Sequence, residues 1–566
     1  MNTNPEPLLP HLAHDGGEIR PSSCENSEVV IAFVAAVGVN LKLAEDAAKA
    51  RLEEIGYRIV NIRVTTDVLP HLDRSASARF ASDFDRIWQM MNIGTAARRK
   101  HGNDIVALGI AAEIARQRPP KESASKTAYL VHSLKHPDEV RRLRELYPRG
   151  FYLIGVHSPP TSRRDFLCTR EGIGKPQANK LMDRDKKENR DFGQQLVETF
   201  HLSDFFAGSE ENDDRETRER SIQLLKNSID RFIEIMFGHP NRTPTFGEYA
   251  MFLAFATALR SADLSRQVGA VIARDGEILG MGANDCPHAG GGLYWPTLDS
   301  ESLTFKDFPA GRDWTRSVDP NRKEQIALIS EVADIVGDEL STELRSHLQK
   351  TLDPEAMDKL QQSLLRKLQR ALLNDSRIAD LTEYGRIVHA EMEALLSCGR
   401  NGVSTTGATL YSTTFPCHNC AKHIIAAGIK RVVFIEPYLK SKALKFHNEA
   451  IELVYPVLSR QTHQDDGKST KVKFEPFFGV GPRKFFDLFS MDIGAGYRMV
   501  RKEKPSGGVK NWSFKGAQIR LQMTIDSYLD RELTAANRFK ELSGQKNHTS
   551  RSGDSGKPSP ASSSPP

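Results

Sequence analysis

The chain has few cysteines, no long hydrophobic run and little excess charge. Its 6 cysteines among 566 residues are too few and too scattered for a disulfide framework. The longest apolar run, residues 29–39, is about half the roughly 20 residues that a membrane helix needs, so we expect no membrane span. With 78 Lys and Arg against 73 Asp and Glu, the net charge of +5 does not indicate capture of long nucleic acid.

Neither end of the sequence shows the patterns expected of a targeting signal or a folded segment. Residues 1–27 lack the basic segment, apolar segment and small-residue cleavage site of an export signal, so we expect a disordered leader and a cytoplasmic protein. Residues 543–566 are rich in Ser, Gly and Pro, with Ala561 as the only apolar side chain. Such a segment cannot bury enough surface to offset its ordering entropy, and we expect a disordered tail.

The length predicts more than one domain, and the first is of the α/β class. Apolar strand candidates alternate with helical patterns, as in a parallel sheet with crossover helices. The predicted strands are residues 28–37, 105–108, 128–131 and 151–156, and the predicted helices include 43–56 and 138–146. We place this first domain at residues 28–208.

A charged stretch at 208–220 and a helix at 221–237 predict a helical linker over residues 209–244. The second domain is expected at 245–500, with a helical insertion at about 297–380. Its predicted elements are a helix at 249–259, strands at 268–273 and 277–281 joined by an Asp-Gly turn, and strands at 408–412 and 431–435. A helical extension is expected over 501–542.

The sharpest motif is His389-Ala390-Glu391 followed by Pro-Cys417-His-Asn-Cys420. Two thiolates and one imidazole give Zn²⁺ three protein ligands and leave the fourth tetrahedral position open for water, as in catalytic sites. The two thiolates also neutralise the dication. Glu391 follows the histidine by two residues and can reach the open position without binding the metal.

Each half of this motif is weak alone, because a lone Cys-x-x-Cys is as often half of a structural zinc site or a redox pair. The order of the elements strengthens it. A helix and a hairpin precede His-x-Glu at the start of a second helix, and a strand precedes Pro-Cys-x-x-Cys at the start of a third. Both ligand groups then lie at helix N-termini, where the helix dipole favours thiolates.

His-x-Glu with Pro-Cys-x-x-Cys is the signature of zinc nucleobase deaminases, and the chain resembles dCMP deaminases around residues 265–272, 282–287, 389–391 and 413–422. From about residue 28 to 500 it is similar to the bacterial two-domain antiphage dCTP/dCMP deaminases. The runs that carry this closer resemblance are residues 133–140, 260–265, 290–295, 436–441 and 476–483. It implies a P-loop kinase-like parallel-sheet domain followed by a three-layer α/β/α cytidine-deaminase-like domain.

The resemblance also implies roles for single residues. His389, Cys417 and Cys420 would hold Zn²⁺, and Glu391 would be the general acid/base. Asn284 would contact the sugar and base, although an ordinary turn residue is the alternative. The backbone at Ala390 would contact the pyrimidine. Arg260 and Arg266 are candidates for the substrate phosphates, with solvated or salt-bridged arginines as the alternative.

A nucleotide site in the first domain is a further candidate, formed by Gly38, Val39, Asn40, Leu41 and Lys42 between a strand and a helix. The motif Gly-x-x-x-x-Gly-Lys-Ser/Thr is absent: Ala35 replaces a glycine, Leu41 replaces the lysine and Lys42 replaces the hydroxyl residue. We therefore expect a regulatory nucleotide rather than phosphoryl transfer. An ordinary strand-to-helix turn is the alternative.

The sequence thus predicts a zinc enzyme that deaminates dCTP or dCMP and so depletes the cytosine deoxynucleotide pool during phage infection, a role that rests on the resemblance. A homo-oligomer is expected, and an inhibitory RNA or a phage product is the candidate trigger. One rival is a polynucleotide-editing deaminase, which would want a basic, aromatic-rich groove. The other is a nucleotide-binding regulator with a structural zinc.

Overall fold

The computed structural model describes residues 27–118, 126–187, 192–210, 214–348, 353–376, 378, 381, 383–438, 441–455, 471–503, 506–515, 517–523 and 527–544. Except for Ser27, which is buried, and residues 543–544, the expected leader and the expected tail lie outside these residues.

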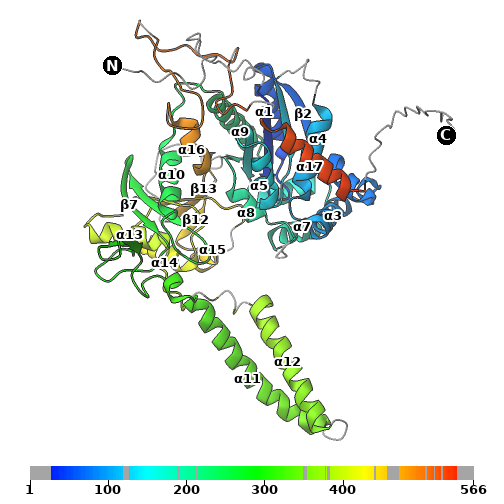
Figure 1. The fold of residues 1–566 in the computed structure, drawn as a ribbon, viewed down its shortest axis with the longest axis vertical. Coiled ribbons are helices and arrows are strands. Elements are labelled where there is room, and N and C mark those ends of the chain that lie inside the picture. Colours follow the sequence, from blue (N-terminus) through cyan, green and yellow to red (C-terminus); the bar gives the residue numbers. More distant parts are fainter. Residues whose placement is uncertain are drawn as a thin grey trace, which may run out of the picture.

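A six-stranded sheet forms the centre of the N-terminal region (Figure 1). Its strand order is β14-β5-β4-β1-β3-β2, and all pairs are parallel except β14 with β5. A parallel sheet of this kind confirms the α/β class expected here. The strands are β1 (Val29–Ala35), β2 (Arg58–Arg63), β3 (Thr127–His132), β4 (Phe151–His157), β5 (Phe205–Gly208) and β14 (Gly479–Val480).

Every residue of β1 is buried because helices cover both faces of the sheet. Val29, Ile31 and Phe33 pack with α1 (Leu41–Glu54) and α9 (Arg215–Met236). Val30 and Ala32 pack on the other face with α4 (Ile105–Gln117) and α5 (Pro137–Leu146). The remaining helices of this region are α2 (Leu69–Leu72), α3 (Asp83–His101), α6 (Pro160–Thr169), α7 (Lys175–Lys187) and α8 (Leu196–His201).

One predicted strand is wrong. Residues 105–108 are the first turn of α4, and Ile105, Val106 and Leu108 are buried between the sheet and other helices. A helix that is apolar on all sides has the same short hydrophobic run as a buried strand, so periodicity alone cannot separate the two.

The expected linker contains α9, and this helix belongs to the N-terminal core. Leu225, Ile229 and Phe232 of α9 are buried against β1 and α1, and Arg51 of α1 binds Asp230 at 2.8 Å. The apolar face of α9 therefore covers one side of the first sheet. The charged stretch before it provides Asp214, whose carboxylate accepts a hydrogen bond from the Thr217 amide and caps the helix.

A second six-stranded sheet has the order β12-β13-β11-β10-β6-β7. Strands β6 and β7 form an antiparallel hairpin, in which Asp275 and Gly276 have φ of 55° and 83° as a type I′ turn requires. β10, β11, β13 and β12 follow as parallel neighbours. The bounds are β6 (Gly269–Arg274), β7 (Glu277–Ala283), β10 (Thr409–Ser412), β11 (Arg431–Phe434), β12 (Ile451–Leu453) and β13 (Val472–Pro476).

Helices cover both faces of this second sheet, which gives three layers. Ala270 and Ile272 pack against α13 (Ala390–Arg400) and α14 (His418–Ala426). Val271 packs on the opposite face with α10 (Phe246–Ala258), in a hydrophobic cluster that continues into the N-terminal region through residues such as Phe206. Two short helices, α15 (Ala443–Phe446) and α16 (Pro482–Phe489), complete this region.

The expected insertion holds a small hairpin, β8 (Thr297–Asp299) with β9 (Thr304–Lys306), and two long helices. These are α11 (Pro320–Leu348) and α12 (Pro354–Asp375), which pair and project away from the two sheets (Figure 1). In the described parts of the chain, no helix has the length and hydrophobicity that a bilayer span requires.

The end of the described chain returns to the N-terminal region. Helix α17 (Leu529–Leu542) lies along α4 (Figure 1). Phe539 is buried there, and Glu532 forms an ion pair with Arg118 at the end of α4. Only residues 529–542 of the extension expected over 501–542 are this helix, and residues 517–521 supply Ala517, Ile519 and Leu521 to the core beneath α9.

Candidate active site

The start of α13 places His389 and Glu391 beside the second sheet. His389 is the residue before the helix, and Ala390 and Glu391 form its first turn. Strand β7 lies so close to this turn that a Cβ on Gly282 would be 2.3 Å from the Ala390 carbonyl oxygen. Only a glycine permits that approach, which fixes α13 on the sheet.

Cys417 and Cys420 stand at the start of α14, which follows β10. Cys417 is the N-cap, and its Sγ accepts a hydrogen bond from the Cys420 amide at 3.4 Å. Because α13 and α14 pack on the same face of the sheet, their N-termini meet. The ligating atoms of His389, Cys417 and Cys420 all lie within 4.8 Å of one another.

The distances in this cluster are short and nearly equal. The Nδ1 atom of His389 is 3.3 Å from Sγ of Cys417 and 3.3 Å from Sγ of Cys420. The Glu391 carboxylate lies beside them, with Oε2 at 3.4 Å from the Cys420 sulfur. These four side chains are the ones that the sequence singled out, and the fold brings them to one point.

The cluster is electrostatically arranged to hold a cation. The hydrogen bond from Cys420, followed by the nearby His389, lowers the pKa of Cys417 to about 3, while the same bond raises the pKa of Cys420 well above its usual value. A dication would favour the thiolate form of both sulfurs.

Burial also controls Glu391, which is 3% exposed. Burial raises the pKa of its carboxyl group above the ordinary value. Ser412, the last residue of β10, donates a hydrogen bond from Oγ to Oε1 of Glu391 at 3.3 Å. The sequence reasoning missed Ser412, although its place at the end of a predicted strand next to the cysteines was a usable signal.

These residues fit Zn²⁺. One imidazole nitrogen and two sulfurs from two helix N-termini are the donor types that zinc prefers, and they are close enough to bind a single ion. Among the described residues, this is the one group of His, Cys, Asp or Glu side chains found with that geometry. Glu391 approaches the same point without belonging to the ligand cluster.

Asn284 follows β7 and is buried. Its Oδ1 accepts a hydrogen bond from the Val268 amide at 2.7 Å, and its Nδ2 donates to the Arg266 carbonyl at 2.8 Å and to Asp263 at 3.0 Å. Asn284 therefore holds the loop before β6 against the end of β7. Arg266 is exposed on this loop, and its positive charge opposes the rise in the pKa of His389 that the bond to Cys417 causes.

Arg260 lies beyond the end of α10 and stacks on Trp295, with 3.6 Å between the guanidinium carbon and the ring centroid. Its Nη2 donates to the Tyr294 carbonyl at 2.8 Å, whereas its buried Nε has no hydrogen-bond partner among the described residues. Burial lowers the pKa of Arg260.

Arg312 is a second buried cation of this region. It donates to the same Tyr294 carbonyl and binds Asp285 at 3.3 Å. The sequence reasoning missed Trp295 and Arg312. Trp295 ends the run 290–295 that carried part of the family resemblance, whereas Arg312 lay in the expected insertion with no local motif.

Residues 38–42 run from the turn after β1 into the first residues of α1, which begins at Leu41. Gly38 has φ of 87°, and a Cβ there would lie 2.6 Å from the Arg163 carbonyl oxygen. The amides of Val39 and Leu41 bond to carbonyls within the loop. The side chain of Lys42 is 70% exposed and pairs with Asp46 at 2.8 Å. The amides of Val39 and Leu41 are thus used within the chain, and Lys42 faces solvent, so none of these groups is directed at a phosphate.

Comparison with known proteins agrees with the metal centre. Residues 244–436 match the family model described as the cytidine and deoxycytidylate deaminase zinc-binding region. The family model and the His/Cys/Cys cluster are both consistent with Zn²⁺ as the cofactor. The matched range contains both helix N-termini and the whole insertion.

The similarity to individual proteins is local. ComE operon protein 2 of Bacillus subtilis is 53% identical over 53 residues, which are 9% of this chain and 28% of that protein. The deoxycytidylate deaminase of Enterobacteria phage T4 is 51% identical over 55 residues, 10% of this chain and 28% of the relative. The chain thus spans less than a third of the length of either relative. The apo dCMP deaminase of cyanophage S-TIM5 aligns with 42% of this chain and 99% of its own at 14% identity, with a TM-score of 0.20.

Proposed function

We propose that the protein deaminates deoxycytidine nucleotides to deoxyuridine nucleotides, with dCMP and dCTP as the candidate substrates. The observation that carries this proposal is the meeting of His389, Cys417 and Cys420 with the Glu391 carboxylate beside them. A structural zinc site would be closed by a fourth protein ligand, and among the described residues no fourth His, Cys, Asp or Glu joins the cluster.

Zinc bound by these ligands would supply Lewis acidity, which makes a water molecule nucleophilic near neutral pH. In the overall reaction the water oxygen forms a bond to C4 of cytosine and the C4–N4 bond breaks, so that ammonia leaves. One proton of the water ends on N3 of the uracil ring and the other on the ammonia.

Glu391 is the residue we propose for moving these protons. Its carboxylate accepts a proton from water, gives one to N3 and later carries one to the leaving amino group at C4. Burial raises the pKa of Glu391, which brings it closer to the range of an efficient acid and base at neutral pH. Ser412 holds Oε1, so that Oε2 stays on the side of the sulfurs.

Substrate recognition is proposed for Asn284, Ala390, Arg260 and Arg266. The Ala390 backbone starts α13 beside the metal ligands, where it can bond to the edge of the pyrimidine. Asn284 would contact the sugar and base while it holds the loop that carries Arg266. Arg266 is the better placed of the two arginines for a phosphate, because it is exposed and its charge acts on His389.

The decisive experiment gives the zinc-loaded full-length protein dCMP, dCDP, dCTP, CTP and cytosine in single-stranded DNA, and measures ammonia release. We expect turnover of the deoxynucleotides and none of the polynucleotide. The matched control is Glu391→Gln, which should bind zinc and release no ammonia. Activity on single-stranded DNA alone would replace this proposal with the editing deaminase.

We further propose that the N-terminal region binds a regulatory nucleotide without transferring its phosphate, because Leu41 occupies the lysine position of the motif and Lys42 faces solvent. In the cell, the protein would be a cytoplasmic homo-oligomer that depletes cytosine deoxynucleotides during phage infection. The loss of an inhibitory RNA, or a phage product, would activate it. Nucleotide pools of infected cells that carry either the wild-type protein or Glu391→Gln test this role.

A further inference from the structure

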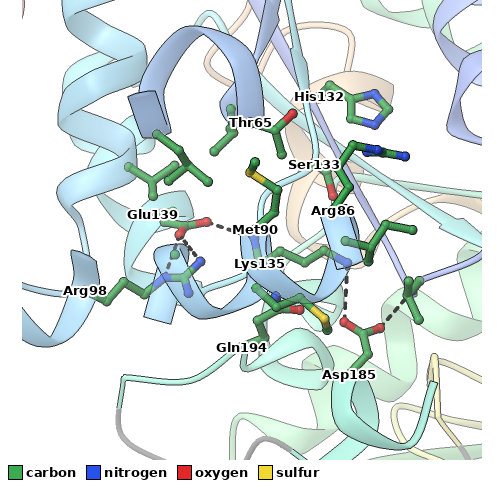
Figure 2. Close-up of a pocket in the computed structure, with 17 residues that line it drawn as sticks. Thr65, Arg86, Met90, Arg98, His132, Ser133, Lys135, Glu139, Asp185 and Gln194 are labelled. Carbon is green, nitrogen blue, oxygen red and sulfur yellow. Dashed lines mark hydrogen bonds and ion pairs between the residues drawn. The ribbon is translucent and has the colours of Figure 1, made fainter. Parts of the chain in front are cut away.

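A cavity of about 160 Å³ lies in the N-terminal region at the carboxyl ends of the parallel strands (Figure 2). Its walls include Val37 after β1 and Ser133 after β3, together with α3 and α7. Strand β3 lies on one side of β1 and the next strand, β4, on the other, so the chain changes direction here. Open α/β sheets bind their ligands at such a point. Ser133 has φ of 70°, a strained conformation for a residue other than glycine.

One buried donor of this cavity, the Nη1 group of Arg98, lacks an acceptor among the described residues. Arg98 is 4% exposed and pairs with Glu139 through Nε and Nη2, but its Nη1 has no hydrogen-bond partner among the described residues. The surrounding wall is apolar, with Leu69, Met90, Met91 and Val106. A buried donor without an acceptor is costly. A flat ring with a carbonyl group would fill the apolar space and supply the acceptor.

One side of the cavity holds a buried carboxylate between two donor groups. Asp185 of α7 is fully buried and accepts a hydrogen bond from the Val37 amide at 2.8 Å. Its other oxygen is 3.5 Å from the Lys135 ammonium, which also donates to the Ala35 carbonyl at 2.7 Å. Figure 2 shows Lys135 and Asp185 at the same side of the cavity. An amide and an ammonium at the end of a strand are a binding site for one anionic group.

Asp185 also reaches the other region of the protein. The hydroxyl of Tyr438, four residues after β11 in the second sheet, donates to the Asp185 carboxylate. Arg163 of α6 donates to the same hydroxyl at 3.1 Å and stacks on the Tyr438 ring at 4.8 Å. The strand that leads to Tyr438 pairs directly with β10, which ends at Ser412 beside Glu391.

We propose that this cavity is the effector site of the N-terminal region and takes a pyrimidine nucleoside monophosphate. The base lies among the methionines with a carbonyl on Nη1 of Arg98. The phosphate takes the Val37 amide and Lys135 in place of Asp185. When Asp185 is displaced, it loses its hydrogen bond from the Tyr438 hydroxyl, and the segment after β11 becomes more mobile. The inference rests on the proposed function and moves its regulatory nucleotide from residues 38–42 to this cavity.

The geometry sets the size of the ligand. The amides of Val39 and Leu41 are used inside the loop, so Val37 and Lys135 provide donors for a single phosphate. At about 160 Å³ the cavity is small beside typical ligand pockets of roughly 300–1,000 Å³, so the smaller pyrimidine base is the better fit. We therefore expect dTMP and dUMP to bind more tightly than dAMP, dGMP or any triphosphate.

Gly94 offers a clean way to close the cavity. It lies on α3 and lines the cavity, and a Cβ there would be 3.7 Å from Nη1 of Arg98, an ordinary contact. Gly94→Leu would fill the space with a good helix former and would leave the Arg98–Glu139 pair in place. Gly94→Ala adds one methyl group and is the matched control.

Binding is measured by calorimetry with dTMP, which has no amino group at C4, on the zinc-loaded full-length protein. We expect binding by the wild type and by Gly94→Ala, and binding weakened by about 10-fold to 100-fold in Gly94→Leu, which is about 1.4–2.7 kcal/mol. Absence of dTMP and dUMP binding in the wild type, or equal binding by Gly94→Leu, would overturn the proposal. Deaminase activity plays no part in this measurement.

The connection to the second sheet is tested by amide hydrogen exchange. We expect dTMP to speed exchange in the segment 431–438 of the wild type and to leave Gly94→Leu unchanged. In Tyr438→Phe, which keeps the stacked ring but loses the hydroxyl, this segment should exchange fast with or without dTMP. Binding without any change at 431–438 would refute the coupling. A protein that binds dTMP but deaminates nothing would refute the proposed function and leave the site standing.

Discussion

The Ser412 hydroxyl lies 3.3 Å from Oε1 of Glu391, at the end of the strand that leads to the two cysteines. The contact joins the strand β10 to the first turn of α13, and both side chains are buried. Ser412 contacts Glu391 and does not belong to the cluster of metal-ligating side chains, so we regard it as a positioning residue.

Replacing Ser412 by Ala should therefore lower kcat without loss of zinc. We expect a fall of about tenfold, the cost of one hydrogen bond that orients a charged group, about 1.4 kcal/mol. Steady-state kinetics on dCMP and dCTP measure it. Ser412→Thr keeps a hydroxyl and should recover part of the activity. Equal kcat in Ser412→Ala and the wild type would show that Glu391 needs no such support.

Glu391→Gln should keep the fold and one zinc per chain and lose deamination by a factor of about 10² to 10⁴, because an amide of the same shape cannot carry a proton. Ammonia release and metal content are measured on the same sample. Near-normal turnover in this variant would mean that another group moves the protons.

The double replacement of Cys417 and Cys420 by Ala should abolish zinc binding, because it removes both thiolate ligands of the cluster. Metal analysis after dialysis is the direct measurement. Cys286→Ala is the control, because that buried thiol hydrogen-bonds to Asp313 outside the cluster. Full zinc retention in the double variant would refute the ligand set.

The C-terminal helix should contribute strongly to stability, whereas the chain beyond it should not. Phe539 of α17 is 3% exposed and packs so closely on α4 that a Cβ on Gly109 would lie 2.8 Å from its ring. Phe539→Ala should cost about 3–5 kcal/mol of unfolding free energy, as large-to-small core changes do. A chain that ends at Leu542 should keep its melting temperature and zinc content. Urea unfolding and thermal melts distinguish the two, and a destabilised truncation would show that the tail docks on the protein.

The burial of His157, at the end of β4, leads us to expect a loss of stability in acid. Burial, together with the charge of Arg163, lowers its pKa from 6.5 to about 3 in the folded protein. Below pH 6.5 the unfolded chain binds a proton that the folded chain does not, so stability falls by up to about 1.4 kcal/mol per pH unit until about pH 3.

The test of this pH dependence compares the wild type with His157→Phe, which keeps a ring against Tyr455. Urea unfolding at pH 7.5, 6 and 5 should show a smaller loss of stability in the variant. Release of zinc in acid affects both proteins and cancels in the difference. Parallel curves would show that folding leaves the pKa of His157 unchanged.

The sequence by itself determined the metal centre, because its information is local. His-x-Glu at the start of α13 and Cys-x-x-Cys at the start of α14, directly after β10, are short patterns that a single sequence records. The buried strand β1 and the Asp-Gly hairpin were predictable for the same reason, since an apolar run and a turn pair act over a few residues.

Only the tertiary structure decided which apolar segments became strands or helices and which distant segments share a core. Residues 105–108 form a helix because the sheet and α17 bury all its sides, a neighbourhood that no local pattern records. In the same way, the carboxylate of Asp185 meets Val37, Lys135 and Tyr438 through contacts as far as 253 residues apart in the chain. Burial and long-range hydrogen bonds form only when the whole chain packs. A single sequence shows which residues are present but not which of them come into contact.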